Sequence, residues 1–171
     1  MIDRRHLGPG LAAFAAALAL ALLGLRADAQ GDREHLVEIQ ILGVNDLHGH
    51  MLAPEAEAGA AQLGGAANLA GALQRAASDF PGRTVRVHAG DMVGASPLIS
   101  SHFRDEPAIE AMNLMGFDAG TFGNHEFDEG PAEALRLLRR ARFPYVSANV
   151  ADFAGRPLVA PYRVLRRAGV R

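Results

Sequence analysis

Three short polar clusters in this sequence carry side chains that could hold metal cations. Asp46 and His48 are separated by one residue, Asp91 stands alone, and Asn124 and His125 are neighbours. An Asp-x-His pair directs both side chains to the same side of an extended segment, because side chains alternate with a period of two. Oxygen and imidazole donors suit Mn²⁺, Zn²⁺, Fe or Co. The sequence has no cysteine, so thiolate ligands and thiol nucleophiles are excluded.

A carboxylate that follows a glycine closely, as Asp91 does, can approach two cations and bridge them. Paired ions roughly 3.5–4 Å apart clamp the attacking and leaving oxygens of a phosphoryl transfer, and they lower the pKa of a water towards about 7. Such a centre needs no serine or cysteine nucleophile. The clusters therefore predict a hydrolytic site with two divalent metal ions as its cofactors.

Each polar cluster follows a segment that is predicted to be a β-strand. The expected order is strand 36–44, helix 65–79, strand 84–88, helix 105–116, strand 119–122, helix 131–139 and strand 144–149. Alternating strands and helices favour an α/β fold with a parallel sheet. Ligands in such sheets gather at the carboxyl ends of the strands, so three loops are expected to converge there. His88 lies within the second strand and is expected to be a buried core residue.

The bulk composition is that of a globular protein. The 171 residues are 49% hydrophobic and 21% charged, with a formal net charge of −2. Because there is no excess of basic residues, general binding of nucleic acids is not expected.

Residues 1–29 are expected to be a secretory signal peptide, and residues 30–171 the mature chain. Arg4 and Arg5 precede an apolar run over residues 11–25, and Ala27-Asp28-Ala29 offers a small-x-small cleavage site. The alternative is a membrane anchor, but a spanning helix needs roughly 20 apolar residues and this run is shorter. The mature protein is therefore expected to be periplasmic or secreted, without stable membrane insertion after cleavage.

Four segments resemble motifs of the bacterial 5'-nucleotidase and 2',3'-cyclic-nucleotide phosphodiesterase family. They are residues 41–50 (ILGVNDLHGH), 64–69 (GGAANL), 89–97 (AGDMVGASP) and 117–128 (FDAGTFGNHEFD). The resemblance covers essentially all of residues 36–171. It implies a calcineurin-like metallophosphoesterase fold, an α/β sandwich of two sheets flanked by helices. It also implies hydrolysis of nucleoside 5'-monophosphates or of 2',3'-cyclic nucleotides, with a small nucleotide as the substrate.

The resemblance also implies a ligand set. Asp46 and His48 would bind the first metal, Asp91 would bridge both metals, and Asn124 would bind the second metal beside the substrate. The family pattern has a later histidine and a Gly-His-x-His segment, whereas this sequence has no histidine after His125. The C-terminal domain that supplies the base- and ribose-binding pocket in the family is expected to be absent as well. The chain is therefore expected to be the N-terminal part of a longer fold, an incomplete sandwich with weak or no activity.

His125 and Asp128 are the expected catalytic pair. The resemblance implies that His125 contacts the phosphate and protonates or stabilises the leaving group, while Asp128 orients His125 and raises its pKa. A positioned general acid contributes roughly 10²–10⁴-fold to the rate. The alternatives are that Asp128 only favours the positive end of the following helix, that His125 is a structural histidine, and that Asp46, Asp91 and Asn124 are turn residues.

The sequence therefore predicts hydrolysis of nucleotide phosphate esters by metal-activated water, a reaction of nucleotide catabolism. The alternatives are a non-catalytic metal-binding remnant and a sulfur-compound hydrolase on the same scaffold. The nucleotidase-like motifs disfavour the sulfur-compound hydrolase, and the intact pair of His125 and Asp128 points to a catalytic ancestor. The sequence predicts neither the metal in use, nor the preferred nucleobase, nor the oligomeric state.

Overall fold

The computed structural model describes residues 36–55 and 62–170. The chain divides into two compact units, Met1–Glu38 and Ile39–Arg171, and every element described below belongs to the second unit. The expected signal peptide at residues 1–29 lies outside the described residues. Within the described part of the chain, no helix has the length and apolar character needed to cross a membrane.

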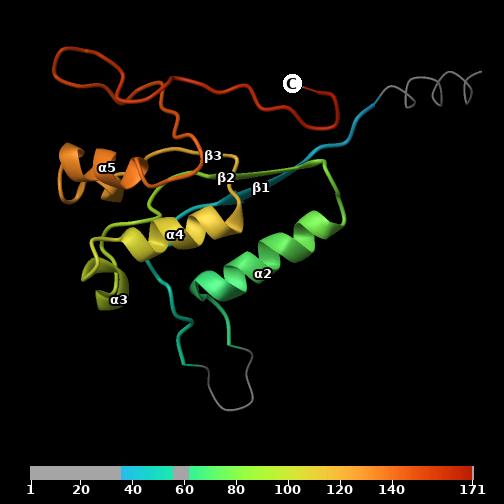
Figure 1. Cartoon of the computed structure of the whole chain (residues 1–171), viewed down its shortest axis with the longest axis horizontal. Coiled ribbons are helices and arrows are strands. Elements are labelled where there is room, and N and C mark those ends of the chain that lie inside the picture. Colours follow the sequence, from blue (N-terminus) through green and yellow to red (C-terminus); the bar gives the residue numbers. More distant parts are fainter. Residues whose placement is uncertain (1–35, 56–61, 171) are drawn as a thin grey trace, which may run out of the picture. The chain divides into compact units, whose positions relative to one another are not determined.

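A parallel sheet forms the centre of this unit (Figure 1). Its three strands follow one another in the order β1 (Gln40–Val44), β2 (Thr84–His88) and β3 (Ala119–Gly120). Val44 pairs with His88, and His88 pairs with Gly120, so the three strands end at the same level. The prediction of a parallel α/β arrangement is confirmed, and the polar clusters leave the sheet at one edge.

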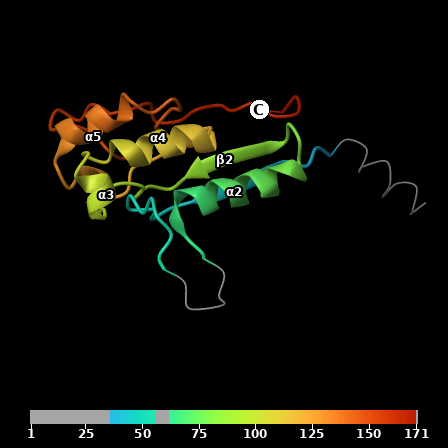
Figure 2. The same ribbon diagram turned by 60° about the horizontal axis from the view of Figure 1, so that its bottom comes forward.

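The helices of the unit are α2 (Gly65–Ser78), α3 (Leu98–Ser101), α4 (Glu106–Met115), the short 3₁₀ helix η2 (His125–Phe127) and α5 (Pro131–Leu138). Helix α4 begins with the acid Glu106 and with Pro107, both favourable in a first turn. It ends at Met115 and is capped by Gly116, whose φ of 70° lies in the left-handed region that glycine adopts easily. Figure 2 shows the arrow of β2 pointing towards α3, the end of the sheet where the polar loops begin.

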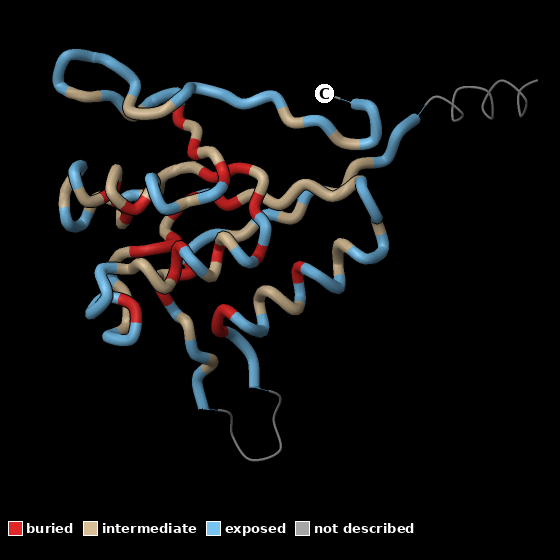
Figure 3. Tube along the Cα trace, in the orientation of Figure 1, coloured by how far each residue is buried: buried red, intermediate tan, exposed pale blue. Residues whose placement is uncertain are grey.

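One hydrophobic core holds these elements together. Helices α2 and α4 contact each other, and Figures 1 and 2 show them side by side. Ile109 and Met112 of α4 are completely buried, and Leu73 of α2 joins them in a cluster against which Leu42 and Val44 of β1 pack. Figure 3 shows the buried residues gathered in the interior of the unit. The core therefore fixes the sheet edge from which the polar loops emerge.

Several predicted elements differ from the structure. The first strand begins at Gln40, not at residue 36, and the strand predicted over residues 119–122 ends at Gly120. The N–H of Thr121 still donates to the carbonyl oxygen of His88, but the chain then leaves the sheet, and the N–H of Gly123 donates to the Glu126 side chain. Residues 144–149 form only isolated bridges, since a strand of two residues offers few partners. The described residues contain one sheet, where the family resemblance implies two.

His88 is buried at the end of β2, which confirms the expectation of a core histidine. The side chain is 3% exposed, and its ring meets those of Phe117, Phe143 and Tyr145 edge to face at centroid distances of 5.0–5.5 Å. Its Nε2 atom has no hydrogen-bond partner among the described residues. Desolvation by burial lowers the pKa of His88 to about 4.

Candidate metal centre

Backbone hydrogen bonds hold the loops that follow β1 and β2 side by side. The N–H of Asp46 donates to the carbonyl oxygen of Gly90 at 3.2 Å, and the N–H of His48 donates to that of Asp91 at 3.0 Å. Asp46, His48 and Asp91 have φ values of 56°, 45° and 52°, which are uncommon for residues other than glycine. The chain therefore turns sharply at three of the predicted ligands while the loops stay paired.

Three side chains come close enough to share one cation. His48, Asp91 and His125 each offer a donor atom, and these atoms lie within 4.8 Å of one another. The rings of His48 and His125 meet edge to face with their centroids 4.8 Å apart. All three side chains are partly buried. Donor atoms bind an ion such as Zn²⁺ at roughly 2.0–2.2 Å, so atoms this close together can face the same cation site.

The ring of His48 is oriented by a backbone carbonyl. Nδ1 of His48 lies 2.9 Å from the carbonyl oxygen of Gly94, which can only accept, so Nδ1 carries the proton. Nε2 then keeps its lone pair for a cation, an arrangement typical of metal-binding histidines. The carboxylate of Asp46 lies 3.7 Å from the same Nε2, and its side chain is 54% exposed. Asp46 therefore borders the group of three without being one of its members.

Asp91 is fixed from two directions. Its Oδ1 accepts a hydrogen bond from the N–H of His125 at 2.9 Å, and its own N–H donates to Glu126 at 3.0 Å. These bonds leave Oδ2 available to a cation, while Oδ1 keeps a second lone pair. Asp91 thus connects the loop after β2 with the loop after β3 at the centre of the group.

Gly123→Ala is expected to weaken Mn²⁺ binding by about 10–100-fold, the range typical of changes to groups that hold metal ligands. A methyl group at this position would lie 2.1 Å from Oδ1 of Asp91, so the carboxylate would have to move. Gly43→Ala is the matched control, because no atom lies within 4 Å of its new Cβ. Isothermal titration of the three proteins with Mn²⁺ measures the effect. Wild-type affinity in Gly123→Ala would contradict the prediction.

Asn124 directly precedes η2 and is exposed. Its side-chain amide makes no hydrogen bond with other described residues, which leaves its oxygen available to a ligand. His50, which also follows the first strand, is exposed and does not belong to the group of three. The structure therefore brings His48, Asp91 and His125 together, places Asp46 beside them and leaves Asn124 next to His125 in the chain.

His125 and Asp128 form a hydrogen-bonded pair. Nδ1 of His125 lies 2.9 Å from Oδ2 of Asp128, and the N–H of Ala95 donates to the same oxygen at 3.2 Å. The hydrogen bond to Asp128 raises the pKa of His125, and the same bond lowers the pKa of Asp128. Since Nδ1 is engaged, Nε2 is the ring atom of His125 that can face a phosphate or a cation.

Asp128→Asn is expected to lower the pKa of His125, because the amide removes the negative charge and the strong acceptor beside Nδ1. In the wild type the imidazolium should therefore persist to higher pH than in the variant. NMR titration of the histidine ring protons in metal-free protein measures the midpoint. The exposed His102 provides a reference signal in the same spectra. An unchanged His125 midpoint would show that the pair has no electrostatic coupling.

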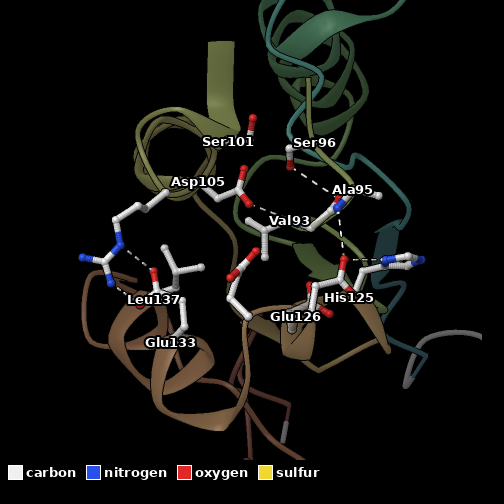
Figure 4. Close-up of a pocket in the computed structure, with 13 residues that line it drawn as sticks. Val93, Ala95, Ser96, Ser101, Asp105, His125, Glu126, Glu133 and Leu137 are labelled. Carbon is white, nitrogen blue, oxygen red and sulfur yellow. Dashed lines mark hydrogen bonds and ion pairs between the residues drawn. The ribbon is translucent and has the colours of Figure 1, made fainter. Parts of the chain in front are cut away.

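A cleft of about 660 Å³ adjoins His125. Figure 4 shows His125 and Ala95 along one wall and Glu133 and Leu137 along the opposite wall. His48 and Asp91 do not line this cleft, so it borders the three-residue group through His125 and does not contain it.

Glu126 is the site residue that sequence reasoning missed. It is part of the Gly-Asn-His-Glu motif, yet no role was predicted for it. In the structure its side chain is 4% exposed and accepts hydrogen bonds from the backbones of both loops that carry Asp91 and His125. A charged residue directly beside a predicted catalytic histidine is the sequence signal that could have found it.

Known proteins match most of this chain. Lmo0130, a cell wall protein of Listeria monocytogenes, is 47% identical over 110 residues, which are 60% of this chain and 14% of the Listeria protein. A probable 5'-nucleotidase of Treponema pallidum is 35% identical over 167 residues, which are 92% of this chain and 27% of that protein. No family model matches the chain.

A solved structure is also similar in sequence and in fold. The calcineurin-like phosphoesterase YfkN of Bacillus subtilis superposes with a TM-score of 0.60 and 29% sequence identity, over 71% of this chain and 40% of that chain. This chain therefore spans less than half of the length of each of these three proteins.

Proposed function

Because this chain belongs to the bacterial family of 5'-nucleotidases and 2',3'-cyclic-nucleotide phosphodiesterases, we propose that it contributes a dinuclear metal centre to the hydrolysis of nucleotide phosphate esters. The membership confirms the calcineurin-like α/β fold expected from the sequence. The observation that carries the proposal is the meeting of His48, Asp91 and His125, from three separate loops, around one point.

The proposed ligands are those that the loops offer at the sheet edge. Asp46 and His48 would hold the first cation, Asp91 would face both cations, and Asn124 would hold the second, with Mn²⁺, Zn²⁺, Fe or Co as candidates. A bound pair of such cations supplies an activated water and neutralises charge on the phosphate. Among the described residues the second cation has only Asp91 and Asn124, so we expect its binding to be weak and the hydrolysis rate of this chain to be low.

His125 is the proposed general acid. Its Nδ1 is held by Asp128, and its raised pKa favours the protonated ring. The oxygen of a water molecule bonds to phosphorus as the ester P–O bond breaks, and Nε2 donates its proton to the departing oxygen. The proton that the water loses passes to solvent, from which the ring of His125 regains one. This role accounts for the neighbourhood of His125 and Asp91, because the scissile bond must lie between the cations and the acid. A proton donor of this kind contributes roughly 10²–10⁴-fold.

The proposal is tested with the purified full chain, stripped of metal and titrated with Mn²⁺. Calorimetry should detect one stronger and one weaker site, and phosphate release from 5'-AMP should rise with occupancy of the weaker site. EDTA should abolish the release, and His125→Asn should reduce it without loss of the stronger site. A chain that binds no divalent cation, or a His125→Asn variant with unchanged turnover, would refute the proposal. A parallel assay with 2',3'-cyclic AMP distinguishes monoester from cyclic diester substrates.

We place this reaction outside the cytoplasm. The basic start, the apolar run and the small-x-small site within residues 1–29 support export. N-terminal sequencing of the exported protein should begin at Gln30, whereas an intact leader in the mature protein would contradict this placement.

A further inference from the structure

We propose that Glu126 is a positioning residue, which fastens the loop after β2 to the loop after β3 and thereby fixes the metal ligands on both. The inference rests on the proposed function for the role of the ligands. The contacts that carry it involve only the chain itself, so they can be tested with and without a cation.

The Glu126 carboxylate accepts three backbone hydrogen bonds. Oε1 accepts from the N–H of Met92 at 2.9 Å, and Oε2 accepts from the N–H of Asp91 at 3.0 Å and from that of Gly123 at 2.5 Å. Met92 and Asp91 belong to the loop after β2, and Gly123 belongs to the loop after β3. A single side chain in η2 therefore ties the two loops together.

A carboxylate suits this position for a specific chemical reason. All three partners are N–H groups that only donate, and a carboxylate offers two oxygens that accept. An amide in its place would turn an NH₂ group towards at least one backbone N–H. Because Glu126 is only 4% exposed, water cannot easily replace a lost partner. The three bonds are therefore expected to depend on the acid and not merely on a polar residue of similar size.

The two loops approach so closely that few contacts other than those of Glu126 can hold them together. A Cβ at Gly90 would lie 2.1 Å from the backbone nitrogen of Gly123, so the loops meet backbone to backbone with no room for side chains between them. Apolar packing cannot hold such a contact. Hydrogen bonds must hold the two backbones together, and those accepted by Glu126 connect one loop to the other.

The position of Glu126 indicates that it orients Asp91 and does not itself contact a cation or the substrate. Both of its oxygens are occupied by backbone donors, and it is not a member of the group formed by His48, Asp91 and His125. Asp91 is held through its N–H by Glu126 and through Oδ1 by the N–H of His125. Loss of the first bond removes one of the two contacts that hold Asp91 in place, so the orientation of its carboxylate would depend on the N–H of His125 alone.

The test compares Glu126→Gln with Asp118→Asn in the full chain. Asp118 is a matched control, because its Oδ2 accepts a hydrogen bond from the backbone N–H of Arg86 at 2.9 Å and links the middle of β2 to the residue before β3, away from the polar loops. Titration with Mn²⁺ should show a dissociation constant about 10–100-fold higher for Glu126→Gln, and an unchanged one for Asp118→Asn. Amide hydrogen exchange on the metal-free proteins should accelerate at Asp91, Met92 and Gly123 only in Glu126→Gln.

The outcomes separate the inference from the proposed function. Unchanged Mn²⁺ affinity and unchanged exchange in Glu126→Gln would overturn the inference, and so would an equal loss of affinity in both variants, which would indicate a general effect on stability. If the wild-type chain binds no Mn²⁺, the proposed function fails, and faster exchange at the three amides alone would still establish the tie between the loops.

Discussion

Asp91→Asn is expected to reduce the affinity for Mn²⁺ by more than about 100-fold, beyond the range typical of changes to residues that only support a ligand. Asp91 is the proposed bridge, so the substitution removes a negative charge beside both cations. The new side chain should keep its oxygen on the N–H of His125, which Oδ1 of Asp91 now accepts at 2.9 Å. Its NH₂ group would then face the cations and repel them.

The choice of asparagine isolates this effect from damage to the fold. Asp91 has a φ of 52°, a conformation that asparagine tolerates better than most residues. Calorimetric titration with Mn²⁺ measures the affinity, and thermal unfolding without metal checks that the variant is folded. Asp79→Asn, at an exposed acid that follows α2, should bind Mn²⁺ as the wild type does. A folded Asp91→Asn variant with wild-type affinity would exclude Asp91 as a ligand.

Acidification is expected to reduce the free energy of unfolding by about 3 kcal/mol through His88 alone. The pKa of His88 is about 4 in the folded protein, against 6.5 for an ordinary histidine. The unfolded chain therefore binds the proton first as the pH falls. Stability that depends on the neutral ring is complete above about pH 6.5 and is lost as the pH falls through about 4.

Urea unfolding at a series of pH values measures this contribution. Many groups titrate over the same range, so the informative quantity is the difference between the wild type and His88→Gln. Between neutral pH and pH 4, the free energy of unfolding of His88→Gln should fall by about 3 kcal/mol less than that of the wild type. His50→Gln, which removes an exposed histidine, is the control variant. Parallel curves for the wild type and His88→Gln would show that His88 is not held neutral by the fold.

The central arrangement of this protein could be predicted from the sequence because its signals are local. Alternating apolar residues mark β1 and β2, and helical periodicity marks α2 and α4. Parallel strands end at a common edge, which made it possible to expect that His48, Asp91 and His125 would meet. The roles assigned to all of the predicted site residues remain predictions, although the contact between Asp128 and His125 provides the geometry that the role of Asp128 requires.

The features that could not be predicted depend on contacts between distant segments. Strand β3 is only two residues long, and the chain then turns so that the N–H of Gly123 meets the Glu126 side chain. The pattern of apolar residues in the sequence does not predict such a turn. Helix α3 covers only four residues, too few to produce a periodic pattern. The role of Glu126 depends on N–H groups that lie more than thirty residues away in the sequence, at Asp91 and Met92.

The paired loops after β1 and β2 have a thermodynamic consequence. The bonds from the N–H groups of Asp46 and His48 to the carbonyls of Gly90 and Asp91 involve no side chain and no ion. Folding of the metal-free chain therefore already forms the loop arrangement of the site. Small zinc domains differ, because they remain unfolded until the metal binds. A chelator should therefore remove the cations and leave a folded protein that can bind them again.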